Sequence, residues 1–327
     1  MKNNGEFGFI EGIREMFASM SDNGFEGIGD DCAVLPIGND EALVFTSDML
    51  NEDIHFRYDI STPYQIGYKS LMVNVSDVAA MGAKPVATLL SLSLPEECFG
   101  KWAEEFMKGY HAASEKYGVK LVGGDTTASV NDIAINVTAI GRAPLANIKR
   151  RSAAQVDDLI VVTGKLGASN VGLHDLLAGR TDTENAKIHL APEARVEEGQ
   201  WLAQHEDVHA MMDISDGISS DLLHILNESQ VSAIVPERYV PVAKGAVLYD
   251  ATDGGEDYEL LFTVGGRNIQ QLMGDFEAKF GKPLYIIGSI IESEDGKHTL
   301  GWECEGGIRY DEEAGGYRHF RYTNLEL

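Results

Sequence analysis

The sequence predicts a two-domain protein of mixed α+β class, and three observations support this. The 327 residues exceed one ordinary domain of roughly 150 residues. Predicted strands and helices intermix without the strict alternation of a doubly wound sheet. Residues 142–152 contain Pro144, show no apolar periodicity and hold a dense basic cluster. We therefore expect an N-terminal domain of residues 1–148 and a C-terminal domain of residues 149–327.

Apolar spacing defines the elements of the N-terminal half. Helical periodicity predicts helices at residues 6–20, 63–81 and 99–117. Pro63 suits the first turn of the second of these helices. Apolar runs predict strands at residues 42–46, 86–94, 119–122 and 132–141. The first of these strands is expected to end at Asp48.

The C-terminal half continues with short strands and helices in mixed order. Strands are predicted at residues 159–162, 231–235, 258–264 and 284–287. Helices are predicted at residues 168–177, 192–204 and 216–227. There are no solenoid repeats and no low-complexity tracts.

Charge and cysteine content narrow the class of function. The chain has 26 Lys+Arg and 52 Asp+Glu, a formal charge of −26, which disfavours binding to nucleic acid or anionic membranes. Solubility alone accounts for much of this charge. The three cysteines lie far apart and form no metal-binding pair, which favours a reducing compartment. The N-terminus lacks a signal-peptide core and no apolar run is long enough to span a membrane, so we expect a cytoplasmic protein.

Acidic residues recur where an apolar element meets a turn rich in glycine or serine. Carboxylates placed there can converge on one cleft, and hard cations such as Mg²⁺ prefer oxygen ligands. Glycine also lets an anion approach backbone N–H groups. Ordinary turns or helix caps would explain each segment singly. The segments are Gly27-Ile-Gly-Asp-Asp-Cys-Ala33, Thr46-Ser-Asp48, Asn74-Val-Ser-Asp77, Gly123-Gly-Asp-Thr-Thr127, Asp213-Ile-Ser-Asp-Gly217 and Gly254-Gly-Glu-Asp-Tyr258.

Asp77 is the hardest of these residues to explain structurally. It lies within a helical pattern between Val75 and Val78, with Asn74 about one turn earlier. An unpaired carboxylate on so apolar a stretch is costly to bury, so a cation partner is expected.

Familiar nucleotide and hydrolase motifs are missing from the sequence. It contains no G-x-x-x-x-G-K-[ST] loop, no dinucleotide fingerprint after a strand and no protein-kinase H-R-D or D-F-G set. A serine-triad hydrolase would need a nucleophile elbow, which is also missing. Any use of ATP must therefore depend on another scaffold.

In this order the acidic segments resemble the thiamine-monophosphate kinase family of the aminoimidazole-ribonucleotide synthetase-like superfamily. The resemblance adds Asp48…His55-Phe56 and a terminal Gly316-Tyr-Arg-His-Phe320, so it covers nearly the whole chain. It implies an N-terminal α/β domain that forms a homodimer and a C-terminal α+β domain that completes the active site. It also implies ATP as co-substrate, several Mg²⁺ ions and thiamine monophosphate as acceptor.

The resemblance also assigns roles to individual residues. The metal ligands it implies are Asp30, Asp31, Thr46, Ser47, Asp48, Asp77, Asp125, Asp213 and Asp216. The nucleotide contacts it implies are Gly124, Asp125, Arg151 and Ser215. The contacts to thiamine monophosphate it implies are His55, Glu256 and Tyr317. No catalytic residue is expected beyond the metal ligands.

Simpler roles remain open for some of these residues. His55 would also suit a partly buried structural histidine, Tyr317 a packing aromatic, and Arg151 a solvated linker charge. The chain also departs from the family, with Ala128 after Gly123-Gly-Asp-Thr-Thr127 and an unusual turn at residues 153–158. These departures concern nearby loops, not the acidic segments.

The implied reaction is in-line transfer of the γ-phosphoryl group from ATP to an acceptor phosphate, with metal ions screening two anions. A phosphate acceptor is already anionic, so no strong general base is needed. The alternatives are an ATP-dependent synthetase of the same superfamily and a non-catalytic magnesium–nucleotide sensor. A selenophosphate synthetase would need a reactive cysteine before Cys32, and a hydrogenase-maturation relative would need a C-terminal cysteine.

Overall fold

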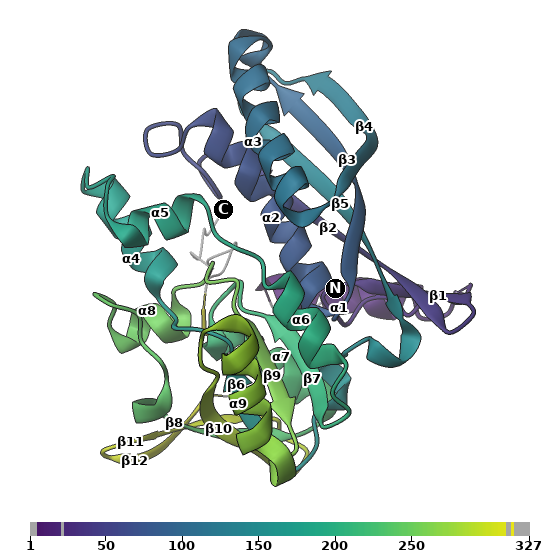
Figure 1. The fold of residues 1–327 in the computed structure, drawn as a ribbon, viewed down its shortest axis with the longest axis vertical. Coiled ribbons are helices and arrows are strands. Elements are labelled where there is room, and N and C mark those ends of the chain that lie inside the picture. The colour runs from purple at the N-terminus through teal and green to yellow at the C-terminus, as the bar shows by residue number, and fades with distance from the viewer. Residues whose placement is uncertain (1–4, 21–22, 312–314, 317–327) are drawn as a thin grey trace, which may run out of the picture.

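The computed structural model describes residues 5–20, 23–311 and 315–316. It contains two mixed β-sheets, each packed against helices (Figure 1). The first sheet uses residues 33–144 and the second uses residues 159–311. The predicted mixed α+β class is confirmed. The predicted domain boundary after residue 148 falls between the two sheets and stays a prediction.

The first sheet has the strand order β1-β2-β5-β3-β4. Its only parallel pair is β3 with β4, and the other neighbours are antiparallel. The strands are β1 (Ala33–Gly38), β2 (Glu41–Asn51), β3 (Lys84–Leu94), β4 (Lys120–Ala128) and β5 (Ala134–Pro144).

Two long helices, α2 (Pro63–Ala80) and α3 (Lys101–Tyr117), lie on one face of this sheet (Figure 1). Thr62 caps α2 in a reciprocal capping box with Gln65, which fixes where the helix begins. The two helices pack very closely, because a Cβ on Gly67 would lie 2.0 Å from the Phe106 carbonyl oxygen. Helix α2 is buried along most of its length, between the first sheet and the second half of the chain.

The other face of the first sheet carries exposed apolar side chains. Met49 is 52% exposed, Leu89 is 40% exposed and Val122 is 55% exposed, whereas their strand neighbours Leu50 and Leu90 are buried. Alternation along each strand therefore gives this sheet one face in the core and one that a single chain leaves uncovered.

The second sheet has the strand order β12-β11-β8-β10-β6-β9-β7, with β8 and β11 parallel. Its strands are β6 (Leu159–Val162), β7 (Val208–Asp213), β8 (Ser232–Pro236), β9 (Leu260–Val264), β10 (Tyr285–Ile291), β11 (Leu300–Cys304) and β12 (Gly307–Asp311). The helices of this half are α4 (Ala168–Leu177), α5 (Glu184–Leu190), α6 (Val196–Ala203), α7 (Ile218–Ser229), α8 (Leu248–Asp253) and α9 (Ile269–Phe280).

Alternating residues of the second sheet divide between two cores. Val162 packs in the cluster that contains Leu222 of α7, whereas Val161 packs with Phe276 of α9. The sheet is therefore covered on both faces, which explains the uninterrupted apolar run of β6.

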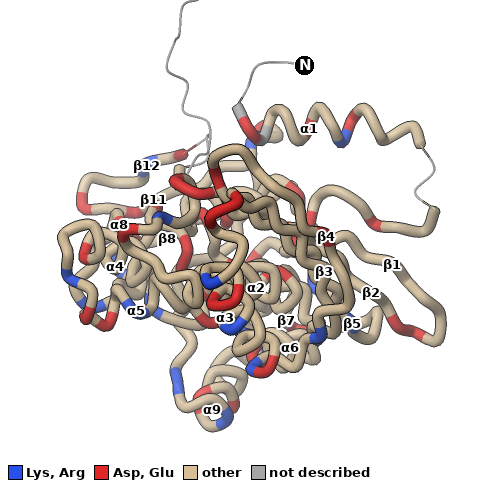
Figure 2. Tube along the Cα trace, turned by 90° about the horizontal axis from the view of Figure 1, so that it is seen from above, with Lys and Arg blue, Asp and Glu red and all other residues tan. Residues whose placement is uncertain are grey.

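Helix α1 (Gly5–Phe17) stands apart from the two sheets (Figure 2). Its Arg14 donates from Nη1 to Glu228 Oε1 of α7 at 2.7 Å, so the start of the chain is tied to the second half. Acidic positions occur on most elements of the trace, as the composition predicts (Figure 2).

The structure confirms most of the predicted elements and corrects several boundaries. The predicted strand 159–162 and helix 168–177 match β6 and α4. The strand expected to end at Asp48 runs on to Asn51, so Asp48 lies inside β2. The strand predicted at 119–122 runs on to Ala128, so the Gly123–Thr127 segment is a strand, not a turn. Backbone pairing with β5 and β3 extends these strands regardless of their polar side chains.

Other differences are smaller. The helix predicted from residue 192 begins at Val196, and the strand predicted from residue 258 begins at Leu260. Several elements were not predicted, namely β1, β7, β11, β12, α5, α8 and α9.

Candidate active site

Three carboxylates from distant parts of the chain meet beside α2. Asp31 precedes β1, Asp77 lies in the last turn of α2, and Asp213 ends β7. One ligand oxygen from each lies within 4.8 Å of the others. Asp77 meets carboxylates from two other segments because α2 is buried between the first sheet and the second half of the chain. The cation partner that the sequence predicts for Asp77 stays a prediction.

Neighbouring hydroxyl groups orient two of these carboxylates. The Ser76 hydroxyl donates to Asp213 Oδ2 at 2.5 Å, and the Thr46 hydroxyl donates to Asp77 Oδ2. Asp48 joins the group from β2, where its backbone N–H donates to Asn74 Oδ1 at 3.0 Å. Thr46 and Asp48 therefore face α2, as alternate residues of one strand should.

Burial and the charges of neighbouring carboxylates raise the pKa of Asp213, Asp48 and Asp77. Burial first, and then the charge of Asp31, raise the pKa of Asp213 to about 8. The same two causes, in the same order, raise the pKa of Asp48 to about 6. Burial and then Asp48 raise the pKa of Asp77 well above its usual value. Carboxylates in this arrangement favour a cation among them.

The residues present fit a divalent metal ion. Asp31 Oδ2 is buried and has no hydrogen-bond partner among the described residues, so a buried oxygen is left for another ligand. The donor set consists of carboxylate and hydroxyl oxygens, the type that Mg²⁺ prefers. In the part of the chain that the structure describes, this is the one group of its kind that could hold a metal.

Arg151 lies against the cluster from the segment that joins the two sheets. Its backbone N–H donates to Asp30 Oδ1 at 2.6 Å, and its Nη2 donates to Asp31 Oδ1 at 2.7 Å. Arg151 is thus fixed beside the carboxylates and is not a solvated linker charge. Burial, with a smaller contribution from the charge of Asp31, raises the pKa of Asp30 despite the hydrogen bond that the Arg151 N–H donates to it.

The predicted ligands Asp125 and Ser47 lie apart from the three-carboxylate group. Asp125 is exposed on β4, and the β5 and β3 strands separate it from β2. The Ser47 hydroxyl lies 3.2 Å from Thr138 Oγ1 of the neighbouring strand, on the side of the sheet away from Thr46. The backbone itself requires glycine at position 124, because φ is +148° there and a Cβ would lie 1.7 Å from the Leu90 carbonyl oxygen.

The loop after β7 connects the cluster to the rest of the site. The Ser215 carbonyl accepts from the backbone N–H of Glu256 at 2.7 Å. Asp221 of α7 accepts from the N–H groups of Asp216 at 3.3 Å and Gly217 at 3.1 Å. Asp221 was not predicted. Asp221 lies five residues after Asp216, in the first turn of the following helix, and this spacing was the signal that could have identified it.

A cavity of about 980 Å³ opens beside these groups. Its polar lining includes Asp48, Asp77, Asp213, Ser215 and Asp216 together with His55 and Glu256. Within the lining, His55 Nδ1 accepts from the backbone N–H of Asn51 at 3.0 Å. Tyr317 lies outside the described residues. The cavity therefore brings predicted metal, nucleotide and acceptor residues together.

The cavity lining also includes Lys69 of α2 and His189 of α5, which the sequence analysis did not identify as site residues. Lys69 Nζ lies 2.6 Å from Glu256 Oε1, and His189 Nδ1 lies 3.4 Å from Glu256 Oε2. Lys69 lies at a position that the apolar spacing of α2 assigns to the buried face. A lysine buried at such a position needs a carboxylate partner, and this need was the signal that the sequence analysis overlooked.

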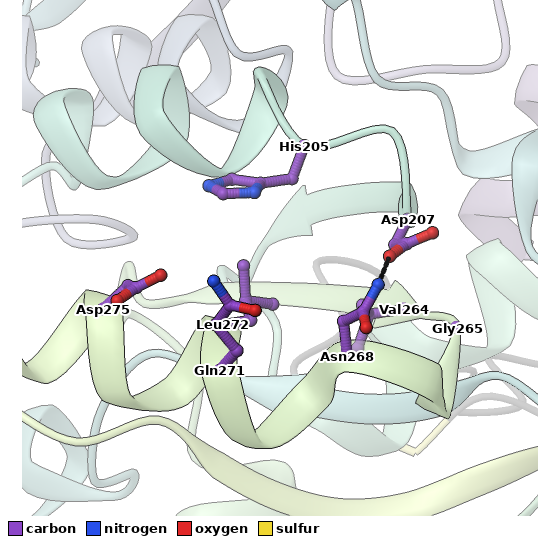
Figure 3. A pocket seen from close by; sticks show the side chains of 8 residues that line it. All are labelled: His205, Asp207, Val264, Gly265, Asn268, Gln271, Leu272 and Asp275. Carbon is purple, nitrogen blue, oxygen red and sulfur yellow. Dashed lines mark hydrogen bonds between the residues drawn. The ribbon is translucent and has the colours of Figure 1, made fainter.

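A second, smaller cavity of about 250 Å³ lies between α9 and the segment that joins α6 to β7. Figure 3 shows its lining, in which the His205 ring faces α9 and Asn268 donates to Asp207. None of the predicted site residues lines it. The larger cavity is therefore the candidate active site.

Comparison with known proteins identifies the family of the chain. Residues 29–143 match the N-terminal domain of AIR synthase related protein, and residues 155–301 match its C-terminal domain. Thiamine-monophosphate kinase of Buchnera aphidicola is 38% identical over 291 residues, which cover 84% of this chain and 87% of that protein. The Bacillus subtilis enzyme of the same name is 33% identical, covering 90% and 93%.

A solved structure shows the same likeness in three dimensions. The structure of AaThiL complexed with AMPPCP and TMP has a TM-score of 0.81 and 30% identity, covering 98% of both chains. Sequence, domain composition and fold agree across nearly the full length. The chain belongs to the thiamine-monophosphate kinase family.

Proposed function

We propose that this protein transfers the γ-phosphoryl group of ATP to thiamine monophosphate, forming thiamine diphosphate and ADP with Mg²⁺ as the metal. The observation that carries the proposal is the group of three convergent carboxylates, Asp31, Asp77 and Asp213, beside a cavity large enough for two substrates. The family supports the substrates, since a solved relative is complexed with an ATP analogue and TMP.

Asp31, Asp77 and Asp213 would hold the metal, with Asp30, Asp48 and Thr46 beside them. Bound Mg²⁺ supplies positive charge that screens the two reacting phosphates. The chain itself supplies orientation: Ser76 and Thr46 hold two carboxylates in place. Asp216, Ser47 and Asp125 are proposed as further ligands, the last two from the first sheet.

Arg151 and Ser215 are proposed to contact the nucleotide, together with Gly124 and Asp125. The guanidinium group of Arg151 is already fixed beside the cluster, and its Nε is buried without a hydrogen-bond partner among the described residues. That donor suits a phosphate oxygen. His55, Glu256 and Tyr317 are proposed to contact the acceptor.

The chemistry needs positioning more than proton transfer. The acceptor phosphate is an anion at neutral pH, so the reaction proceeds without a strong general base. Holding the two anions in line at one site increases the rate of phosphoryl transfer through proximity and through stabilisation of the transition-state charge. A cavity lined by carboxylates at one side is consistent with this mechanism.

We further propose a homodimer formed by the first sheet. Met49, Leu89 and Val122 leave an apolar face that a second copy would cover. Light scattering should give twice the chain mass at micromolar concentration, and an active monomer would contradict the dimer.

No helix among the described residues is long and apolar enough to cross a membrane. The cytoplasmic location stays a prediction.

The direct test incubates purified protein with ATP, MgCl₂ and thiamine monophosphate, and follows thiamine diphosphate and ADP. Equal amounts of both products are expected. Binding of ATP without thiamine diphosphate would instead favour a non-catalytic nucleotide sensor. Turnover with formylglycinamidine ribonucleotide alone would favour a synthetase of the superfamily.

A further inference from the structure

Lys69 is a buried lysine inside the candidate active site. It lies on α2, is 5% exposed, and places Nζ 2.6 Å from Glu256 Oε1. Lysine is almost never fully buried without a partner, because removing its charge from water is costly. Glu256 is the carboxylate that pairs with it, so the two side chains form one unit in the cavity wall.

Glu256 is held from several directions. Its backbone adopts φ +56°, an uncommon conformation for a residue with a side chain. His189 Nδ1 of α5 lies 3.4 Å from Oε2, and Ser169 Oγ of α4 lies 3.0 Å from the same nitrogen. With Lys69 on α2, three helices therefore fix the position of one carboxylate.

The surrounding charges keep this carboxylate ionised. Burial alone would raise the pKa of Glu256, but the charge of Lys69 and its hydrogen bond to the carboxylate outweigh burial and leave the pKa lowered. Burial first, and then Lys69, lower the pKa of His189 to about 4, so its ring is neutral near pH 7. The network near neutral pH is thus one lysine cation, one carboxylate and a neutral imidazole.

The Glu256 carboxylate lines the same cavity as a group of apolar side chains. The Glu256 side chain is 30% exposed, and α5, which carries His189, also contributes Leu190 to the lining. Ile60 packs on Leu190 and Leu176, which joins this lining to the core between α4 and α5. The apolar lining residues include Ile54, Ile60, Leu173, Leu177 and Leu190. Such a surface suits the rings of an acceptor, not its phosphate.

We propose that Lys69 and His189 are positioning residues that hold the Glu256 carboxylate toward the ring portion of the acceptor and so set its specificity. This inference rests on the proposed function, because thiamine monophosphate carries a cationic thiazolium ring and an aminopyrimidine with N–H donors. A fixed carboxylate both accepts those hydrogen bonds and balances the ring charge. Lys69 and His189 act through Glu256 and need not touch the substrate.

The test compares steady-state kinetics of Lys69→Met, Glu256→Gln and the double variant. Lys69→Met should raise KM for thiamine monophosphate about tenfold, while kcat and KM for ATP stay within about twofold. In the Glu256→Gln background the same substitution should have little further effect, because the two residues act as a unit. Lys116→Met is the matched control, since Lys116 pairs with Glu193 at 2.5 Å outside the cavity.

The pH profile and a conservative pair of variants separate positioning from a structural role. Without Lys69 the pKa of Glu256 should rise, so KM for thiamine monophosphate should fall as pH increases from 6 to 8 only in Lys69→Met. His189→Asn keeps a nitrogen near the position of Nδ1 and should retain most of the affinity, whereas His189→Leu should not. If Lys69→Met does not fold, Lys69→Gln gives the same comparison with a neutral donor.

A wild-type KM and pH profile in Lys69→Met, even with a lower melting temperature, would overturn the inference and leave a merely structural ion pair. Fully additive effects of Lys69→Met and Glu256→Gln would overturn it too. The wild type is assayed first: if it makes no thiamine diphosphate, the proposed function fails and this inference fails with it. If the wild type is active and the variants behave normally, only this inference fails.

Discussion

The carboxylates of Asp77 and Asp213 and the carboxylate of Glu256 line the same cavity but have different neighbours. Asp77 and Asp213 face other carboxylates, and burial and repulsion raise the pKa of both. The Glu256 side chain is 30% exposed and faces Lys69, and its pKa is lowered even though burial alone would raise it. The neighbouring charge therefore outweighs burial at Glu256, whereas at Asp77 and Asp213 it adds to burial.

This difference also separates two kinds of binding site. The Glu256 carboxylate already has its counter-ion within the fold, so its charge is stable without a ligand. The cluster of Asp31, Asp77 and Asp213 lacks enough internal cations, because Arg151 pairs with only Asp31 among the three. The cluster is therefore the part of the cavity that should depend on added metal.

The largest expected effect follows from removing one charge of the cluster. Asp77→Asn keeps the size of the side chain and an acceptor for the Thr46 hydroxyl, but removes a ligand charge. We expect kcat to fall by roughly 10²–10³, the usual loss for one electrostatic contact in a transition state. Without metal, the melting temperature should rise, because a repelling carboxylate has been neutralised.

Steady-state turnover and thermal unfolding in EDTA measure the two effects. Asp275→Asn, in the second cavity, is the matched control and should leave both quantities unchanged. Near-normal kcat in Asp77→Asn would contradict the assignment of Asp77 as a ligand.

A smaller effect is expected from magnesium on the stability of the wild type. Magnesium at 100 times its dissociation constant should stabilise the folded protein by about 2.7 kcal/mol, because it binds the native cluster alone. Titrating MgCl₂ during thermal unfolding measures this gain. Asp77→Asn should lose most of it and Lys69→Met should keep it, and an equal loss in both variants would remove the distinction between the two sites.

A pH-dependent loss of stability is expected from His189. Its pKa is lowered to about 4, compared with about 6.5 in an unfolded chain, so the unfolded state binds more protons between these values. Stability should therefore fall as pH decreases from about 6.5 to about 4, by on the order of 3 kcal/mol at most. Urea unfolding of wild type and His189→Leu should show this slope only in the wild type. Parallel slopes would mean that His189 is already solvated in the folded protein.

The sequence predicted the buried apolar elements well because their periodicity reflects packing. Helix α2 from Pro63 and strand β6 were predicted nearly to the residue. Extension of β2 past Asp48 and of β4 past Val122 was missed, since pairing with distant strands holds those polar segments in the sheet. Helix α9 was overlooked even though its buried residues Leu272 and Phe276 keep helical spacing.

The candidate site likewise contains some residues that the sequence predicted and others that it did not. Asp31, Asp77 and Asp213 were identified from local motifs, and the structure brings them together. Lys69 and His189 were missed because their significance depends on Glu256, which is far from both in sequence. Contacts between elements are not encoded in the periodicity of either element alone.

Helix α2 carries both Lys69 and Asp77, eight residues apart on one rigid element. At the rise of an α-helix, this separation is about 12 Å along the axis. The helix therefore fixes the distance between the place where the acceptor is recognised and the place where phosphate charge is neutralised. Substitutions between these two positions leave that distance unchanged. An insertion or deletion between them would change it at once, so the family is expected to preserve the number of residues between these two positions.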